Sequence, residues 1–166
     1  MAEANRDRIN PSLLDRLTDE GPGGSGRGAS TTVSELRKSV LRDLTWLFNT
    51  TQILNGEESE AWPQVRSSIL NYGLPALAGT HASSVDVARL ERALRQAIID
   101  FEPRILADSV SVKAQLDEAL DHHNVISLHI AGLLWAQPVP IELLLRTQLD
   151  LESGQSRVEE TIPGRR

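Results

Sequence analysis

The chain has 166 residues, a formal net charge of -6 and no cysteine. This length suits one domain with a single core, and the acidic balance disfavours nucleic acid and anionic membrane surfaces as partners. The lack of cysteine excludes disulfides, thiol nucleophiles and thiolate metal sites, and it favours a reducing compartment such as the cytoplasm. Neither a signal peptide nor a run of about 20 apolar residues is visible, so we expect no export and no direct membrane insertion.

The first predicted element is a short helix with leucines on one side. Ser12 is its expected N-cap, and Leu13, Leu14 and Leu17 form the apolar side. Residues 20–30 then contain five glycines and predict a flexible linker. A short apolar helix on such a tether can be a strap for its own domain or a peptide that docks on another protein.

A long helix is predicted next. Thr32 and Glu35 have the spacing of a capping box, and apolar residues then recur at helical intervals as far as Asn49. These apolar residues are Leu36, Val40, Leu44, Leu47 and Phe48. Trp46 falls slightly off their stripe, so an interface role is open to it, although we expect core packing.

Residues 50–81 have weak periodicity and predict a short helix followed by an irregular loop. Residues 83–86 then open a second long helix, which should end before Pro103 because proline disfavours helix in the preceding residue. Its apolar face comprises Val87, Leu90, Leu94, Ala97, Ile98 and Phe101. Glu91 and Arg95 are one turn apart on the other face and are expected to pair.

Beyond the second helix the apolar period changes to two, which predicts strands. The pattern is loose over residues 105–112, clearer over 126–130, where Ser127 and His129 should face away from the core, and cleanest over 141–152. A turn at Ser153 and Gly154 would bring residues 155–159 back as a short edge strand.

The order of these elements, with helices first and strands later, predicts an α+β fold. Two main helices and the short N-terminal helix should pack on a small antiparallel β-sheet. We divide the chain into a flexible N-terminal segment with a short docking helix and a Gly-rich linker, residues 1–30, a folded domain, residues 31–158, and a polar tail, residues 159–166.

The junction between helix and sheet carries two opposite charges around a proline. Glu102 and Arg104 flank Pro103, whose ring makes the chain a rigid corner there. Charges held in this way are either paired with each other or presented to a partner. Both arrangements are compatible with the sequence.

Asp100 and Glu102 are the nearest candidates for a catalytic carboxylate pair. Residues two apart on a helix point to different sides, whereas glycoside hydrolysis needs two carboxyls about 5–9.5 Å apart across the bond. Long-range pairing remains open for Glu102, and the candidate carboxylates are Asp117, Glu118 and Asp121.

We expect neither a metal nor a cofactor. His122 and His123 are adjacent, and on extended chain adjacent side chains face opposite ways. Only His81 and His129 remain as further histidine ligands, and there is no cysteine. No serine lies in a G-x-S-x-G setting, and the glycine-rich segment lacks the Lys-Ser/Thr ending of a phosphate loop. The residues therefore indicate no catalytic site.

Five segments, in this order, resemble the TssE family of bacterial type VI secretion baseplate subunits, which are related to the lysozyme-like wedge protein of contractile phage tails. The resemblance extends over about residues 10–158, so residues 31–158 would be a lysozyme-like wedge domain. The five segments are residues 12–17, 39–50, 70–75, 101–104 and 134–140.

The resemblance implies a structural protein that is not an enzyme. In the family the corner, here Glu102, Pro103 and Arg104, contacts the helical core bundle of the wedge subunits TssF and TssG. Family members also offer strand edges on which the contractile TssB/TssC sheath begins to assemble, which would work by β-augmentation. The implied location is the bacterial cytoplasm, in the baseplate at the cytoplasmic face of the inner membrane.

We therefore expect partner binding by the corner and by Leu13, Leu14 and Leu17. Replacement of Arg104 by alanine should weaken capture of the wedge partners and leave stability within about 1 kcal/mol, as for a surface change. The alternative function is a peptidoglycan-cleaving muramidase. The sequence offers no well-placed second carboxylate for glycoside hydrolysis, which argues against this alternative.

Overall fold

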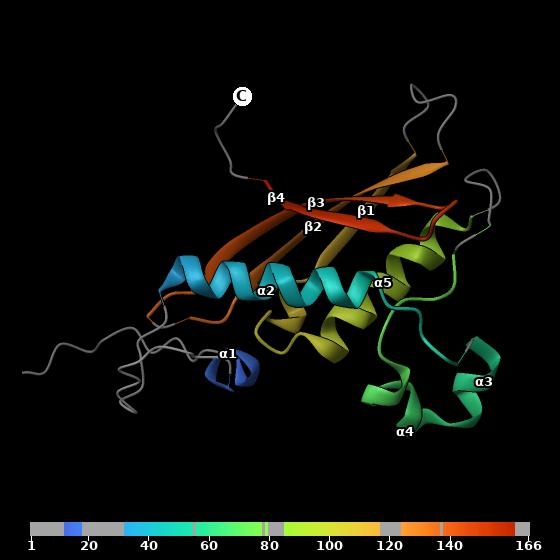
Figure 1. Cartoon of the computed structure of the whole chain (residues 1–166), viewed down its shortest axis with the longest axis horizontal. Helices are drawn as coiled ribbons and strands as arrows, with labels where there is room; N and C mark the ends of the chain where they lie inside the picture. Colours follow the sequence, from blue (N-terminus) through green and yellow to red (C-terminus); the bar gives the residue numbers. More distant parts are fainter. Residues whose placement is uncertain are drawn as a thin grey trace, which may run out of the picture.

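The computed structural model describes residues 12–17, 32–54, 56–77, 79, 85–116, 124–136 and 138–161. Two long helices lie along a four-stranded antiparallel sheet (Figure 1), which confirms the predicted α+β fold. The glycine-rich linker and the last residues of the polar tail lie outside the described residues. The elements are α1 Leu13–Leu17, α2 Val33–Phe48, α3 Gly56–Ala61, α4 Pro63–Arg66, η1 Ile69–Asn71, α5 Val87–Phe101, η3 Ala107–Ser109, β1 Ser111–Leu116, β2 Val125–Leu134, β3 Ile141–Asp150 and β4 Ser156–Glu160.

Helix α2 begins with the predicted capping box. The Glu35 backbone N–H donates to Thr32 Oγ1 at 3.2 Å, and the Thr32 N–H donates to Glu35 Oε2 at 2.7 Å. The helix ends at Phe48, and Asn49 is its C-cap. The predicted apolar stripe is buried, together with Ser39, which lies within it.

Helix α5 begins after Asp86, whose side chain accepts the Arg89 N–H at 3.0 Å, and it ends at Phe101 as the proline predicts. The expected pairing of Glu91 with Arg95 is wrong. Both side chains instead reach the backbone near β1, because α5 packs directly against that strand.

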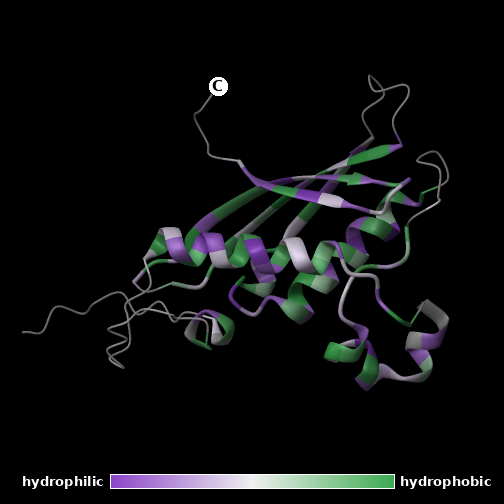
Figure 2. Cartoon of the chain, viewed as in Figure 1, coloured by the Kyte–Doolittle hydropathy of each residue, from purple (hydrophilic) through white to green (hydrophobic). Residues whose placement is uncertain are grey.

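The sheet has the order β1-β2-β3-β4, with every neighbouring pair antiparallel. Hydrophobic and hydrophilic residues interchange along the strands (Figure 2), most regularly in β3, where buried and exposed positions alternate. Helix α2 packs along β4 and helix α5 along β1. The predicted edge strand is therefore present as β4, and it continues to Glu160.

The first strand expected from the sequence is wrong in its position. Ile105 makes only an isolated bridge with Leu134, and a 3-10 turn occupies Ala107–Ser109 before β1 begins at Ser111. The Ser109 side chain donates to the Leu106 carbonyl at 2.6 Å, and this local bond favours the turn over extended chain. Ser127, expected to face away from the core, is also buried.

Residues 50–77 form a lobe with two short helices and a 3-10 turn in place of the single helix expected (Figure 1). Asn71 organises it, because its Oδ1 accepts the Leu54 N–H at 2.8 Å and its Nδ2 donates to the Arg66 carbonyl at 3.3 Å. Gly73 has a φ of 126°, and a Cβ there would lie 2.4 Å from the Thr50 carbonyl oxygen. Only glycine fits this close approach.

Candidate functional site

The corner after α5 is held at both ends by backbone hydrogen bonds. The Ile105 N–H donates to the Glu102 carbonyl at 3.1 Å, and the Trp135 N–H donates to the Arg104 carbonyl at 2.7 Å. The corner is thereby tied to the residue that follows β2. Pro103 is exposed at its tip, whereas Glu102 is only 3% exposed.

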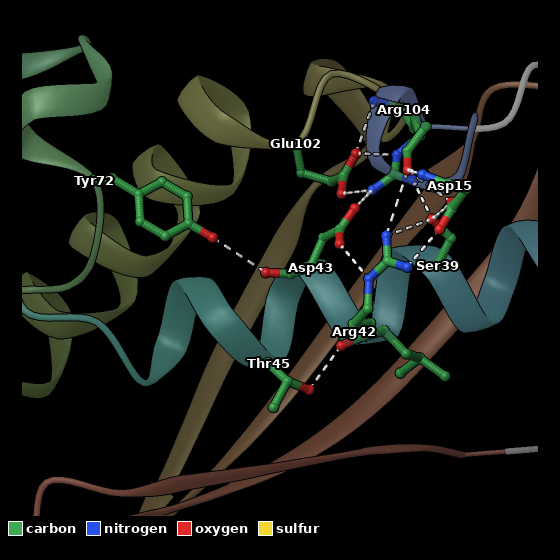
Figure 3. Close-up of polar contacts among 10 residues, drawn as sticks. Asp15, Ser39, Arg42, Asp43, Thr45, Tyr72, Glu102 and Arg104 are labelled. Atoms are coloured by element: carbon green, nitrogen blue, oxygen red, sulfur yellow. Dashed lines mark hydrogen bonds and ion pairs between the residues drawn. The ribbon is translucent and has the colours of Figure 1, made fainter. Parts of the chain in front are cut away.

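Glu102 and Arg104 pair with each other through two parallel bonds (Figure 3). Arg104 Nε donates to Glu102 Oε1 at 2.7 Å, and Arg104 Nη2 donates to Oε2 at 2.5 Å. The Arg104 backbone N–H also donates to Oε1, at 3.2 Å. This fork of donors on a carboxylate is the strong form of ion pair, and it orients the guanidinium.

The same guanidinium reaches α2. Arg104 Nη1 donates to Ser39 Oγ at 2.8 Å, and Arg104 Nη2 lies 2.5 Å from Asp43 Oδ2. Ser39 and Asp43 are one helical turn apart, so α2 presents both to one arginine. The corner is therefore fixed to the first long helix as well as to the sheet.

A second arginine extends the contacts to α1. Arg42 Nη1 lies 2.5 Å from Asp15 Oδ1, and Arg42 Nε donates to Asp43 Oδ1 at 2.9 Å. Ser39 Oγ donates to the other oxygen of Asp15 at 2.7 Å, and Ser12 Oγ does so at the same distance. We call Asp15, Ser39, Arg42, Asp43, Glu102 and Arg104 the corner network.

The contacts of the corner network shift the pKa values of Asp15 and Arg104. The hydrogen bond from Arg42 holds the pKa of the Asp15 carboxyl well below its usual range, with Ser12 and Ser39 adding to the effect against partial burial. Burial by itself lowers the pKa of Arg104, but the bonds and charges of Glu102 and Asp43 outweigh it and raise the pKa above the usual value. Asp15 and Arg104 therefore stay charged at neutral pH.

Tyr72, which belongs to the lobe, contacts the corner network at Asp43. Its hydroxyl donates to the Asp43 carbonyl at 3.3 Å, and its ring meets Phe101 edge to face at 5.2 Å between centroids. Burial, and then the charges of Asp43 and Glu102, raise the pKa of the Tyr72 phenol. The 70–75 segment thus packs beside the corner.

The predicted site residues divide into buried and exposed groups. Glu102 and most of Arg104 are buried, and Pro103 is exposed. Leu14 is 40% exposed and Leu17 75% exposed on α1, whereas the side chain of Leu13 lies outside the described part of the structure. Polar contacts through Asp15 hold α1 against α2.

Sequence reasoning missed the members of the corner network that lie on α1 and α2. Asp15 lies three residues after Ser12, which is the spacing of an N-cap bond and is visible in the sequence. Ser39 is a polar residue within an apolar stripe, which also signals a buried bond. Nothing in the sequence links Asp15 to Arg42 or Ser39 to Arg104, because these contacts span 27 and 65 residues.

The expected core packing of Trp46 is wrong. Trp46 is 50% exposed, and its ring lies 5.1 Å from the Arg42 guanidinium, a cation–π contact. Trp135, whose N–H bonds to the corner, is 44% exposed. Large aromatic side chains on a surface are typical of protein interfaces. Two of them therefore adjoin the corner network.

The structure gives little support to catalytic chemistry at the corner. Arg104 engages both oxygens of Glu102, and Asp100 accepts a bond from Gln96 at 2.8 Å. No group of three or more potential ligands that could hold a metal occurs among the described residues. Several candidate residues lie outside the described residues, namely the histidines His81, His122 and His123 and the long-range partners proposed for Glu102, Asp117, Glu118 and Asp121.

Where the chain is described, no helix is long and apolar enough to cross a membrane.

These features define a class of protein, a small α+β domain whose rigid corner is tied to both helices and sheet. Residues 34–139 match the family described as baseplate wedge protein gp25. The chain belongs to this family and is a baseplate wedge component of phage tail-like contractile systems, a structural and non-enzymatic class. No curated protein and no solved structure matches the chain.

The family match covers α2 through β2 and includes the corner and Trp46. It does not include α1, β3 or β4. The description of the family refers to a baseplate wedge, and the lysozyme-like part of the resemblance has no support from it.

Proposed function

We propose that this chain is the TssE-type wedge subunit of a bacterial type VI secretion baseplate. It joins the wedge formed by TssF and TssG, and it provides a platform on which the TssB/TssC sheath assembles. The observation that carries the proposal is membership of the baseplate wedge family with the Glu102-Pro103-Arg104 corner complete and ordered. Such a subunit would work in the bacterial cytoplasm, at the cytoplasmic face of the inner membrane.

The corner suits a partner because it is organised before binding. Glu102 holds the Arg104 guanidinium, and Asp43 and Ser39 accept further bonds from it, so little side-chain entropy is lost on association. A partner would then contact Pro103 and the accessible part of Arg104, whose side chain is 20% exposed.

Exposed apolar side chains near the corner network supply the remaining contact area. Trp46 stacks on Arg42 of the network, and Leu14 and Leu17 project from the helix that the network holds. Aromatic residues beside an ordered arginine are typical of the residues that carry most binding energy in interfaces. We place the TssF/TssG contact here.

Co-expression of the tagged chain with TssF and TssG tests the proposal. The variant Trp46→Ala should reduce capture at least about tenfold, because an interface tryptophan commonly contributes 2 kcal/mol or more. Trp62→Ala is the matched control, since Trp62 is 63% exposed but lies in the lobe near α4. Circular dichroism should show both variants folded.

Failure of the folded wild-type chain to capture either partner would contradict the proposal. Equal capture by both tryptophan variants and the wild type would move the contact away from Trp46. The muramidase alternative has its own assay, turnover of purified peptidoglycan. The engagement of Glu102 by Arg104 speaks against it, because a general acid must be available to the leaving group.

The sheath would be received at the edge of the sheet. β4 is the last strand in the order and the one beside α2. An edge strand can pair its free backbone groups with an extended segment of another chain. A strand from a sheath subunit added to β4 would continue the sheet of this domain into the sheath.

A further inference from the structure

The sheet has two edge strands, β1 and β4, and each could in principle accept another strand. Side chains from the two long helices contact the backbone at both edges. These contacts differ between the edges. Their positions decide where a partner strand can pair.

The β1 edge is blocked at two positions by α5. Glu91 Oε1 accepts the Ala114 N–H at 2.9 Å, and Arg95 Nε donates to the Val110 carbonyl at 3.0 Å. Because alternate residues of a strand direct their backbone groups to the same side, Val112 and Leu116 also face outward in β1. The bonded Ala114 lies between them, so β1 has no two consecutive outward-facing positions that are both open. A partner strand would have to displace two charge-assisted bonds.

The outward-facing residues of β4 follow from its bonds to β3. The Asp150 N–H donates to the Gln155 carbonyl at 2.9 Å, and the Thr161 N–H donates to the Leu144 carbonyl at 2.8 Å. The odd-numbered residues of this segment, like Gln155 and Thr161, therefore direct their backbone groups toward β3. Ser156, Val158 and Glu160 direct their backbone groups outward.

Asn49, the C-cap of α2, occupies the first of these positions. Its Oδ1 accepts the Ser156 N–H at 2.8 Å, and its Nδ2 donates to the Ser156 carbonyl at 3.0 Å. A side-chain amide that bonds to both groups of one residue takes the place of a peptide unit in a neighbouring strand. Ser156 is thus already paired within the chain.

The other end of β4 is also reached from α2. Arg37 Nη2 donates to the Glu142 carbonyl at 2.8 Å, and Arg37 pairs with the Glu160 carboxylate. These contacts leave the outward backbone groups of Val158 and Glu160 without a partner in the part of the chain that the structure describes. The open section of the edge therefore consists of these two residues.

We propose that the two long helices direct strand addition to β4 and that Asn49 sets its register. An extended segment pairs with Val158 and Glu160 and stops at Ser156, where the Asn49 amide occupies the pairing position. The inference rests on the proposed function, in which the added strand belongs to a sheath subunit. The blocked β1 edge explains why the strand would join one edge only.

Amide hydrogen exchange tests the choice of edge. The chain is measured alone and after addition of TssB/TssC sheath subunits, with the amides of Val158 and Glu160 compared with that of Val112. We expect at least tenfold slower exchange at Val158 and Glu160, and no change at Val112. Protection at Val112 in place of β4 would overturn the inference while sheath docking stood. Protection at neither edge would overturn sheath docking, and the inference with it.

Cysteine cross-linking tests the register, since the chain has no cysteine of its own. A cysteine at the exposed position 159, made as Glu159→Cys, is paired with single cysteines along the strand of the sheath subunit. The chain with native Asn49 should cross-link in one register. Asn49→Ala should add a second register shifted by two residues, because Ser156 becomes free to pair.

Thr50→Ala is the matched control for this register experiment. Thr50 Oγ1 donates to the Trp46 carbonyl at 2.7 Å, much as Asn49 Nδ2 donates to the Thr45 carbonyl at 2.8 Å. Each substitution removes one side-chain bond to the end of α2, but only Asn49 contacts β4. A single unchanged register in Asn49→Ala would overturn the role of Asn49, as would a second register in Thr50→Ala.

Discussion

At the scale of single residues, Arg104 has a structural role that its position at a surface corner does not suggest. It pairs with Glu102, which is only 3% exposed, and with Asp43 on another helix. Removal of the guanidinium would leave a buried carboxylate without its counter-charge. The expectation of a change within about 1 kcal/mol, which holds for surface positions, therefore no longer applies.

We predict that Arg104→Ala lowers the free energy of unfolding by about 3 kcal/mol, as for a broken buried ion pair. The double variant Glu102→Gln, Arg104→Ala should be less destabilised than Arg104→Ala alone, because no buried charge remains unpaired at Glu102. Urea unfolding measures both values. A loss of less than about 1 kcal/mol in Arg104→Ala would instead identify the arginine as mainly a partner contact.

Asp15 makes the docking of α1 dependent on pH. Its pKa in the folded chain lies below the ordinary value of 3.8, so the carboxylate stabilises the docked helix above that pH. This stabilisation decreases as the pH falls below 3.8, where the undocked carboxyl takes up a proton, and it is lost as the pH falls through the lower pKa of the docked carboxyl. NMR signals of the Leu14 and Leu17 methyl groups should report the release of α1 on acidification. Asp15→Asn should show α1 less firmly docked at neutral pH and little further change in acid.

At the scale of elements, β4 combines internal pairing with an open side. Successive residues of β4 alternate in the direction of their backbone groups. The Val158 N–H therefore faces outward, while the neighbouring Arg157 bonds to β3. Proline removes one backbone donor, and an edge strand tolerates it where that donor faces away from the sheet. Proline at position 158 therefore removes a donor from the open section of the edge and leaves the bonds between β4 and β3 in place.

We predict that Val158→Pro abolishes sheath assembly in reconstitution with TssB and TssC, while the domain stays folded. Val158→Thr, which keeps the backbone donor and a branched side chain, is the control and should assemble normally. Electron microscopy of sheaths and a thermal melt of each variant measure the two effects. Normal assembly in the proline variant would exclude the outward N–H of Val158 as a sheath contact.

At the scale of the whole molecule, the corner network joins three parts of the chain. Asp15 comes from α1, Ser39, Arg42 and Asp43 from α2, and Glu102 and Arg104 from the segment after α5 (Figure 3). The short N-terminal helix is therefore held by polar bonds, whereas the apolar core lies between the long helices and the sheet. Loss of α1 should leave that core intact.

Deletion of residues 1–30 should leave a folded domain, because the buried core contains no residue from that segment among the described residues. We expect the truncated chain to be less stable by about 1–2 kcal/mol, since Arg42 and Ser39 lose their bonds to Asp15. Incorporation into baseplates should fall as well. Thermal melts and co-purification with TssF and TssG measure these effects, and an insoluble product would show that α1 belongs to the core.

The sequence by itself determined the elements whose signals lie in consecutive residues. The capping box of α2, the end of α5 before Pro103 and the alternation along β3 all depend on neighbours within a few positions. The first strand was misplaced because a side-chain bond of Ser109 favours a turn where the apolar pattern alone suggests extended chain. Local competition of this kind is not visible in periodicity.

Only the tertiary structure decided the partners of polar side chains. The bond from Arg104 to Asp43 spans 61 residues, and the bond from Asn49 to Ser156 spans 107. Both depend on how α2 packs against the rest of the domain, and burial of apolar area sets that packing without regard to particular polar pairs. The rigid corner was therefore predictable from Pro103, while its network and the open section of β4 were decided by the packed fold.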